Sequence, residues 1–352
     1  RWFLLPIHPR FREIIMSASL LEKQSTGGAI ARVGFEYQDA FVLRSLPLWL
    51  SQSAFSHIVS EALSDIEVCY FSSEKSLHVM YEAKNHSLTA TEFWDEIRRF
   101  KSLFDTHPKN FIWFNLVCPS YNTAISPLIS KIDRLRGVGS SYDDDSSVSV
   151  NGRSEYLDWC VGKKIDFSLA EFALDYVGFI TFNSENSESI FLSEIQDTIN
   201  IELLRSQVKQ LKDQFKNLIS RSSFGPIYRK DFENFICHAL EEDRSQWLLD
   251  PIKINLSASS SQYQDLNLDI SDFNGPDRAQ KTSSDWNNLI KKAVSIGDFI
   301  HSSGDRRTLL IDGKQRMSTA CMLGYVFSAT RNFLLEIEHN GLIYRTDDHK
   351  QK

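Results

Sequence analysis

Cysteine is scarce in this chain, and the few cysteines show no pairing pattern. Five cysteines are scattered over 352 residues without a Cys-x-x-Cys motif, and their number is odd. This distribution excludes the disulfide framework of small secreted proteins and offers no regular zinc-ligand spacing. No apolar run approaches the roughly 20 residues that cross a bilayer, so we expect no membrane anchor. Together these absences predict a cytoplasmic protein with reduced, mostly buried thiols.

An excess of positive charge is also missing. The chain has 39 lysines and arginines against 46 aspartates and glutamates, which gives a net charge of −7. This balance excludes a constitutively basic nucleic-acid-binding protein, so any nucleic-acid surface must be local. One such region exists, because residues 84–136 contain eight basic and five acidic residues. Its candidate DNA contacts are Arg98, Arg99 and Lys101, although a mixed, solvated helix face explains them equally well.

Two neighbouring stretches have the alternating apolar and polar pattern of β-strands. Residues 64–71 (SDIEVCYF) and 77–84 (LHVMYEAK) are rich in Val, Ile, Tyr and Phe, and a short polar turn separates them. We therefore predict a β-hairpin. Glu82 and Lys84 are two residues apart and share a strand face, and Asp65 at the start of the other strand is near enough to join them.

This trio of side chains suits metal-assisted hydrolysis of a phosphodiester. Carboxylates such as Asp65 and Glu82 hold Mg²⁺ or Mn²⁺, and the backbone carbonyl of Ala83 is a further candidate ligand. Lys84 would orient the attacking water or offset the charge that develops on the phosphate. Glu67 shares the strand face of Asp65 and could be a ligand or a neighbour of the ligands. A solvated ion pair on a strand face is the plainer interpretation of Glu82 and Lys84.

Three segments of the sequence resemble one known nuclease family. They are residues 26–40 (TGGAIARVGFEYQDA), 65–68 (DIEV) and 81–85 (YEAKN). They resemble the PD-(D/E)xK nuclease domain of bacterial antiphage effectors, the nucleases of CBASS systems that carry a C-terminal SAVED sensor domain. The similarity covers residues 24–120 best. The patterns also predict a helix at residues 34–50, a strand at about 56–62, a helix that opens at 89–92 and runs to 103, and an apolar strand at 109–118. Together with the hairpin these give the order helix, three strands, helix and strand, which is also the core order of that fold.

The resemblance implies a role for the first helix. Residues 34–50 have helical apolar spacing and follow a glycine-rich lead-in at residues 27–28. In the family this helix packs beside the catalytic strands and often brings one more polar group to the metal. Gln38 and Glu36 are the candidates here, and Gln38 is favoured by its match to the family motif. A solvated helix face explains both residues equally well.

A second informative stretch lies near the end of the chain. Residues 308–312 have the pattern of an apolar strand, 313–316 that of a turn and 317–330 that of a helix. The helix N-terminus at such a turn can bind an anion. The stretch resembles the opening of the SAVED domain, a Rossmann-like sensor related to CARF domains, which binds a cyclic oligonucleotide in that family. The resemblance implies that this chain holds only the first part of such a domain. The candidate ligand contacts are Lys314, Arg316 and Ser318.

We therefore expect an α/β protein in which a PD-(D/E)xK restriction-endonuclease-like domain precedes a partial Rossmann/CARF-like SAVED domain. Within it, the patterns predict an exposed loop at residues 137–154 and one long amphipathic helix at residues 190–219. Residues 1–15 lack an initiator Met and are interpreted as an upstream extension, with Met16 as the start. The expected division is 1–15 (extension), 16–225 (nuclease), 226–285 (connecting segment and start of the sensor) and 286–352 (first part of SAVED).

The function that the resemblance implies is a metal-dependent double-stranded DNA endonuclease of antiphage defence by abortive infection. Its activator would be a cyclic oligonucleotide, with a cyclic trinucleotide as the expected class, and its switch would be ligand-induced homo-oligomerisation. Composition and spacing show neither the substrate nor the activator. Two alternatives therefore stay open. One is an unregulated restriction or repair nuclease, and the other is a catalytically idle scaffold that binds nucleic acid.

Overall fold

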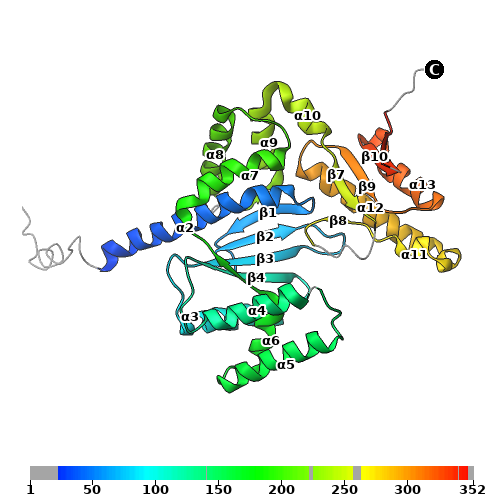
Figure 1. Ribbon diagram of the computed structural model, residues 1–352. Coiled ribbons are helices and arrows are strands. Elements are labelled where there is room, and N and C mark those ends of the chain that lie inside the picture. The colour runs from blue at the N-terminus through cyan, green and yellow to red at the C-terminus, as the bar shows by residue number, and fades with distance from the viewer. Residues whose placement is uncertain (1–22, 140, 222–224, 257–262, 340, 348–352) are drawn as a thin grey trace, which may run out of the picture.

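Two β-sheets organise the computed structural model, which describes residues 23–139, 141–221, 225–256, 263–339 and 341–347 (Figure 1). The expectation for residues 1–15 lies outside the described residues. No helix in the described part of the chain combines the length and the apolar character that a membrane crossing requires.

The first sheet contains the hairpin that the sequence predicts. Strands β2 and β3 are antiparallel neighbours, while β3, β4 and β5 run parallel to one another. The strand order is β5-β4-β3-β2-β1-β6. The strands are β1 (Phe55–Ser60), β2 (Ile66–Tyr70), β3 (Leu77–Ala83), β4 (Phe111–Cys118), β5 (Val177–Thr181) and β6 (Ile227–Tyr228).

Helices cover both faces of the first sheet, as Figure 1 shows. Successive residues of a strand face opposite sides. Accordingly, Val79 of β3 belongs to the apolar core beneath α2, α7, α8 and α9, whereas Met80 belongs to the core beneath α3, α4, α5 and α6. The helices are α2 (Lys23–Ser51), α3 (Ala90–Thr106), α4 (Ser126–Gly139), α5 (Ser147–Gly162), α6 (Phe167–Tyr176), α7 (Ser187–Ile199), α8 (Arg205–Ile219) and α9 (Arg229–Leu240).

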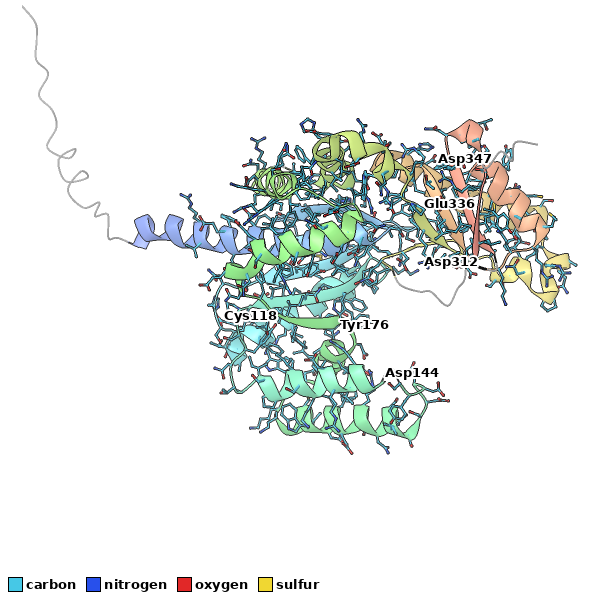
Figure 2. The ribbon with its side chains drawn as sticks, turned by 45° about the horizontal axis from the view of Figure 1, so that its top comes forward. Cys118, Asp144, Tyr176, Asp312, Glu336 and Asp347 are labelled. Atoms are coloured by element: carbon cyan, nitrogen blue, oxygen red, sulfur yellow. The ribbon has the colours of Figure 1, made fainter. Side chains whose placement is uncertain are left out.

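Two predicted segments differ from the structure. The long helix expected at 190–219 is wrong, because α7 ends at Ile199 and Asn200 adopts a left-handed conformation with φ 54°. Such a conformation ends a helix, and Asn tolerates it better than most residues. The loop expected at 137–154 is too long, since the Ser146 hydroxyl accepts from the backbone N–H of Ser149 and caps α5. Figure 2 shows Asp144 at the turn between α4 and α5.

The first helix is also longer than its apolar spacing predicts. It begins at Lys23 and runs through the glycine-rich lead-in that was expected to precede it. Its buried side chains include Phe41, whose ring lies 5.3 Å from that of Tyr81 on β3. Tyr81 and Glu82 are adjacent in one strand and therefore face opposite sides of the sheet. Helix α2 thus packs on the face opposite to Glu82.

The second sheet has the order β11-β10-β9-β7-β8, and only β11 is antiparallel to its neighbour among these strands. The strand, turn and helix predicted at residues 308–330 are present as β9 and α13. Residues 226–285, expected to connect the domains, supply β6 to the first sheet and β7 and β8 to the second. The elements are α10 (Arg244–Leu249), β7 (Ile252–Asn255), β8 (Leu266–Asn267), α11 (Ser271–Asn274), α12 (Ser283–Ser303), β9 (Thr308–Asp312), α13 (Met317–Val326), β10 (Leu334–His339) and β11 (Leu342–Arg345).

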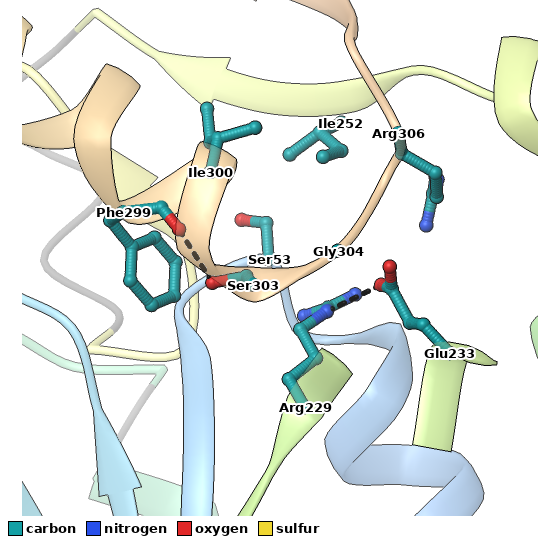
Figure 3. A pocket seen from close by; sticks show the side chains of 9 residues that line it. All are labelled: Ser53, Arg229, Glu233, Ile252, Phe299, Ile300, Ser303, Gly304 and Arg306. Atoms are coloured by element: carbon teal, nitrogen blue, oxygen red, sulfur yellow. Dashed lines mark hydrogen bonds and ion pairs between the residues drawn. The ribbon is translucent and has the colours of Figure 1, made fainter. Parts of the chain in front are cut away.

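A buried ion pair lies where helix α9 meets both sheets (Figure 3). The guanidinium of Arg229 donates to Glu233 Oε1 at 2.8 Å and to the backbone oxygens of Leu50 and Gln52 at 2.9 and 2.7 Å, so it also holds the end of α2. Arg229 and Glu233 are each only 4% exposed. A Cβ on Gly304, which follows α12, would lie 1.8 Å from Glu233 Oε2, so glycine alone fits there.

Candidate active site

The three side chains of the predicted motif meet where β2 begins and β3 ends, in the middle of the first sheet. The register pairs Ile66 with Tyr81, which sets Asp65 beside Glu82 on the next rung. Asp65 Oδ2 accepts a hydrogen bond of 2.7 Å from the backbone N–H of Ala83. Lys84 follows β3 directly, and its Nζ lies 2.7 Å from Glu82 Oε1. The hairpin therefore brings two carboxylates and one ammonium together.

Helix α3 completes the cluster with two residues that extend the motif. A capping box of Thr89 and Glu92 fixes where α3 begins, and its apolar side packs into the core. On its other side, Glu96 Oε1 lies 2.9 Å from Lys84 Nζ, and Glu96 Oε2 accepts from Arg99 Nε at 2.8 Å. Arg99 also donates to Glu82 Oε2. The sequence alone indicates no role for Glu96, because only its position one turn before Arg99 distinguishes it from other acidic residues.

Burial and charge shape the ionisation of this cluster. Burial, together with the negative charge of Glu82, raises the pKa of Asp65 to about 6, against the opposing effects of the Ala83 N–H and of Lys84. Burial disfavours the charged form of Lys84, but its contacts with Glu82 and Glu96 outweigh burial and raise its pKa. Arg99 and Lys84 outweigh burial at Glu96 and lower its pKa. Three carboxylates thus face two cations, and a negative charge remains uncompensated.

The raised pKa of Asp65 predicts that its charge destabilises the metal-free protein. The folded state holds the Asp65 proton up to about pH 6, whereas the unfolded chain releases it near its ordinary pKa of 3.8. The free energy of unfolding should therefore fall as pH rises from 4 to 6 and stay low above it. We expect Asp65→Asn to stabilise the protein at pH 8 by on the order of 2–3 kcal/mol in a chelating buffer.

Thermal unfolding at pH 8 and pH 5 would measure this effect, and the stabilisation should shrink at the lower pH. Asp95→Asn is the matched control, because Asp95 is exposed on α3 and pairs with Arg98 one turn away. That exposed pair should change stability by less than about 1 kcal/mol at either pH. An Asp65→Asn protein that unfolds at a lower temperature than the parent at pH 8 would contradict the expectation.

The structure does not join the predicted first-helix residues to this cluster. Among the described residues, no hydrogen bond links Gln38 or Glu36 to Asp65, Glu82 or Lys84. Glu36 instead pairs with Arg32 at 3.1 Å on an exposed turn of α2. The physical reason is that α2 packs on the opposite face of the sheet. The catalytic role of Gln38 stays a prediction.

The remaining site candidates lie in different surroundings. Glu67 has the same strand face as Asp65 but bonds to His78, with Oε1 2.5 Å from Nδ1. Of the expected DNA contacts, Arg99 donates to Glu82 and Glu96 within the cluster, and its contact with DNA stays a prediction. Arg98 is exposed and pairs with Asp95, whereas the partly buried Lys101 pairs with Asp105 at 2.8 Å. Their role in DNA binding stays a prediction.

The predicted sensor residues border the carboxyl end of β9, where Asp312 lies (Figure 2). Gly313 has φ 138°, which favours glycine and allows the sharp turn. Asn274 holds this turn, because its Nδ2 donates to the backbone oxygen of Lys314 at 2.7 Å. Lys314, Arg316 and Ser318 are all exposed. The turn is therefore anchored by its backbone, while these side chains extend into solvent.

Comparison with known proteins identifies the family. Residues 26–223 match a family model described as "Cap4, dsDNA endonuclease domain". A CD-NTase-associated protein 4 from an Acinetobacter species is 99% identical over 337 residues, which are 96% of this chain and 73% of that relative. The chain belongs to the Cap4 family. A second Cap4 relative, from Moraxella osloensis, is 75% identical over 339 residues, again 96% of this chain and 73% of the relative.

Solved Cap4 structures have the same fold. The Acinetobacter baumannii Cap4 SAVED/CARF-domain containing receptor with the cyclic trinucleotide 3′3′3′-cAAA is 96% identical, with a TM-score of 0.84 over 91% of this chain and 70% of that chain. The Moraxella osloensis Cap4 receptor is 70% identical, with a TM-score of 0.83 over 92% and 74%. The expected fold class is confirmed, namely an α/β nuclease domain followed by a SAVED part. Asp65, Glu82 and Lys84 all lie within the Cap4 double-stranded DNA endonuclease domain.

Proposed function

We propose that this Cap4 protein is a metal-dependent double-stranded DNA endonuclease of bacterial antiphage defence, which a cyclic oligonucleotide activates in the cytoplasm. One observation carries the nuclease half. Asp65, Glu82 and Lys84 meet at the ends of strands β2 and β3, inside a domain that belongs to a DNA endonuclease family. The sensor half rests on relatives whose solved structures contain 3′3′3′-cAAA or 2′3′3′-cAAA.

The donor set fits a hard divalent cation. Two carboxylates and a backbone carbonyl are oxygen ligands of the kind that Mg²⁺ and Mn²⁺ prefer. The raised pKa of Asp65 reflects burial and the nearby negative charge of Glu82, and a bound cation would offset both effects. Asp65, Glu82 and the carbonyl of Ala83 would hold Mg²⁺ or Mn²⁺. When bound, such a cation supplies Lewis-acid polarisation of the scissile phosphate and a more acidic water.

Other residues near the candidate cation site would orient the attacking water, stabilise charge on the phosphate and hold the carboxylates in place. Lys84, held by Glu82 and Glu96, keeps its ammonium charged and aims it at the carboxylate pair. From that position it orients the attacking water and offsets the negative charge that develops on the phosphate. The Ala83 N–H fixes one oxygen of Asp65 and leaves the other for the cation. The Ser64 hydroxyl lies 3.2 Å from Glu82 Oε2 and helps to hold that carboxylate in place.

Arg99 competes with the cation for Glu82, because its guanidinium donates to Glu82 Oε2. Removing this positive charge should strengthen cation binding. We expect Arg99→Gln to lower the Mg²⁺ concentration for half-maximal cleavage by on the order of tenfold, as electrostatics near a partly buried charge would give. Arg153→Gln is the matched control, since Arg153 lies on α5 outside the cluster and likewise pairs with two carboxylates, those of Glu171 and Asp175. A higher Mg²⁺ requirement in Arg99→Gln would mean that Arg99 supports the cation site instead.

The sensor proposal rests on the parallel second sheet. Ligands of open parallel sheets bind outside the carboxyl ends of the strands. The turn after β9 lies at such an end, and it leads into helix α13 beside Lys314, Arg316 and Ser318. The N-terminus of a helix and two cationic side chains suit the phosphates of a cyclic trinucleotide. Ligand-induced assembly of several copies would then combine the weak DNA affinity of each nuclease domain.

Cleavage of linear double-stranded DNA by the full-length protein in Mg²⁺ would test the whole proposal. The reactions would contain no nucleotide or one member of a panel of cyclic di- and trinucleotides, including both cAAA isomers. We expect cleavage only with one class of cyclic trinucleotide, accompanied by a larger sedimenting species on DNA. Cleavage without any nucleotide would favour the unregulated nuclease. No cleavage under any condition would favour the idle scaffold.

A further inference from the structure

A row of metal-binding side chains crosses the first sheet beside the candidate active site. The register pairs His57 of β1 with Cys69 of β2, and Cys69 with His78 of β3. Directly opposed residues of antiparallel strands point to the same face, with their Cβ atoms about 5 Å apart. Glu67 precedes Cys69 by two residues and shares that face. The sequence alone does not reveal this cluster, because no two of these residues have the spacing of a zinc motif.

The ligand atoms are already close together. Atoms of Glu67, Cys69 and His78 all lie within 4.8 Å of one another. Cys69 Sγ is 3.4 Å from His78 Nδ1, and Glu67 Oε1 is 2.5 Å from the same nitrogen. With the usual zinc bond lengths, ligand atoms of a tetrahedral site lie about 3.3–3.6 Å apart. The sulfur–nitrogen distance therefore already fits such a site. The Glu67 oxygen lies closer to Nδ1 than in such a site, so its carboxylate would have to move away from that nitrogen by less than about 1 Å.

The side chains of this cluster are mostly buried, as expected for a binding site that the fold itself forms. Glu67 and Cys69 are 7% and 1% exposed, so their side chains are removed from solvent, while His78 keeps an accessible edge. A buried carboxylate requires compensation by a partner or a cation. The donor set of sulfur, nitrogen and oxygen matches a borderline cation such as Zn²⁺, whereas Mg²⁺ prefers oxygen ligands alone. Chemistry thus separates this cluster from the pair of Asp65 and Glu82.

We propose that Glu67, Cys69 and His78 form a second cation site of the zinc type, with His57 beside its fourth position. Its nearest residue, Glu67, lies about 7 Å along β2 from Asp65, the span of two residues in a strand, and Cys69 lies two residues farther along. A bound Zn²⁺ would tie β2 to β3, the two strands that carry Asp65 and Glu82. It would therefore hold the catalytic hairpin in register without taking part in hydrolysis. The inference does not depend on the proposed function.

Cobalt provides the test, because Co²⁺ bound to a thiolate has a charge-transfer absorption band in the near ultraviolet. The full chain, freed of metal by a chelator, would be titrated with CoCl₂ and then with ZnCl₂. We expect one equivalent of Co²⁺ to produce the band and Zn²⁺ to remove it. Cys69→Ser and His78→Gln should abolish the band and weaken Co²⁺ binding at least tenfold. Asp65→Asn, which alters the neighbouring carboxylate pair, should keep the band.

Matched controls separate this site from adventitious thiol binding. Cys321 is exposed and Cys160 is buried on α5, and replacing either with serine should leave the titration unchanged. Glu67→Gln preserves size and serves if Cys69→Ser fails to fold; it should weaken Co²⁺ binding while thermal unfolding stays cooperative. A parent protein without the band at stoichiometric Co²⁺ would overturn the proposal. So would a band that persists in folded Cys69→Ser.

Discussion

Replacing Lys84 with alanine should reduce DNA cleavage by about 100-fold or more, the usual cost of losing one group that stabilises developing charge. Lys84 is the cation that bridges Glu82 and Glu96 at 2.7 and 2.9 Å, and its charge faces the carboxylate pair. Without it, the attacking water loses its orienting donor and the phosphate loses its countercharge. The rate of cleavage of linear DNA, measured with saturating Mg²⁺ and activator, would report the change.

The variant should remain folded, which allows the loss to be assigned to chemistry. Glu82 keeps Arg99 and Ser64 as partners, and Glu96 keeps Arg99. Lys163→Ala is the control, since Lys163 is an exposed lysine, distant in sequence from the residues of the cluster, with its ammonium 5.9 Å from the ring centroid of Trp159. It should cleave DNA at the parental rate. Lys84→Ala activity within a few-fold of the parent would remove Lys84 from the mechanism.

Glu233→Gln should lower the free energy of unfolding by about 3–5 kcal/mol, because it leaves a buried guanidinium without its counterion. Arg229 lies 2.8 Å from Glu233 Oε1, and Arg306 lies in the same pocket (Figure 3). The glutamine keeps the size of the side chain but removes the negative charge that faces both arginines. We expect the midpoint of thermal unfolding to fall by about 5 °C or more.

The chain contains a matched exposed pair for this experiment. Arg32 and Glu36 have the same residue types and the same i,i+4 spacing, but their side chains are 82% and 64% exposed instead of 5% each. Glu36→Gln should change stability by less than about 1 kcal/mol. The difference between the two variants isolates the contribution of burial. Equal effects of the two substitutions would contradict the assignment of Arg229 and Glu233 as a stabilising junction.

Local patterns in the sequence were sufficient for several elements. Alternation over residues 64–71 and 77–84 predicts the β2–β3 hairpin, and the structure pairs these strands in the expected way. In the structure, Thr89 and Glu92 form the capping box that begins α3, which also involves only residues close in sequence. The motif of Asp65, Glu82 and Lys84 follows from the hairpin alone. Such features depend on neighbours within a few residues, so a linear sequence determines them.

Local patterns failed where a distant contact decided the conformation. Apolar spacing continues across residues 190–219, yet the chain turns at Asn200 because α7 and α8 pack separately on α2. The spacing likewise gives no sign that α2 packs on the sheet face opposite to Glu82. The turn at Asn200 and the placement of α2 both depend on which helix surfaces pack against one another and against the sheet.

The chain's sequence by itself determined its α/β class, the β2–β3 hairpin and the strand–turn–helix of β9 and α13, because hydrophobic periodicity and caps act locally. Only the tertiary structure decided that Glu96 and Arg99 surround Glu82, since these residues come from a helix that must first dock on the sheet. Strand register decided that Cys69 and His78 face one another. Side chains distant in sequence become a site only when packing fixes the distance between them.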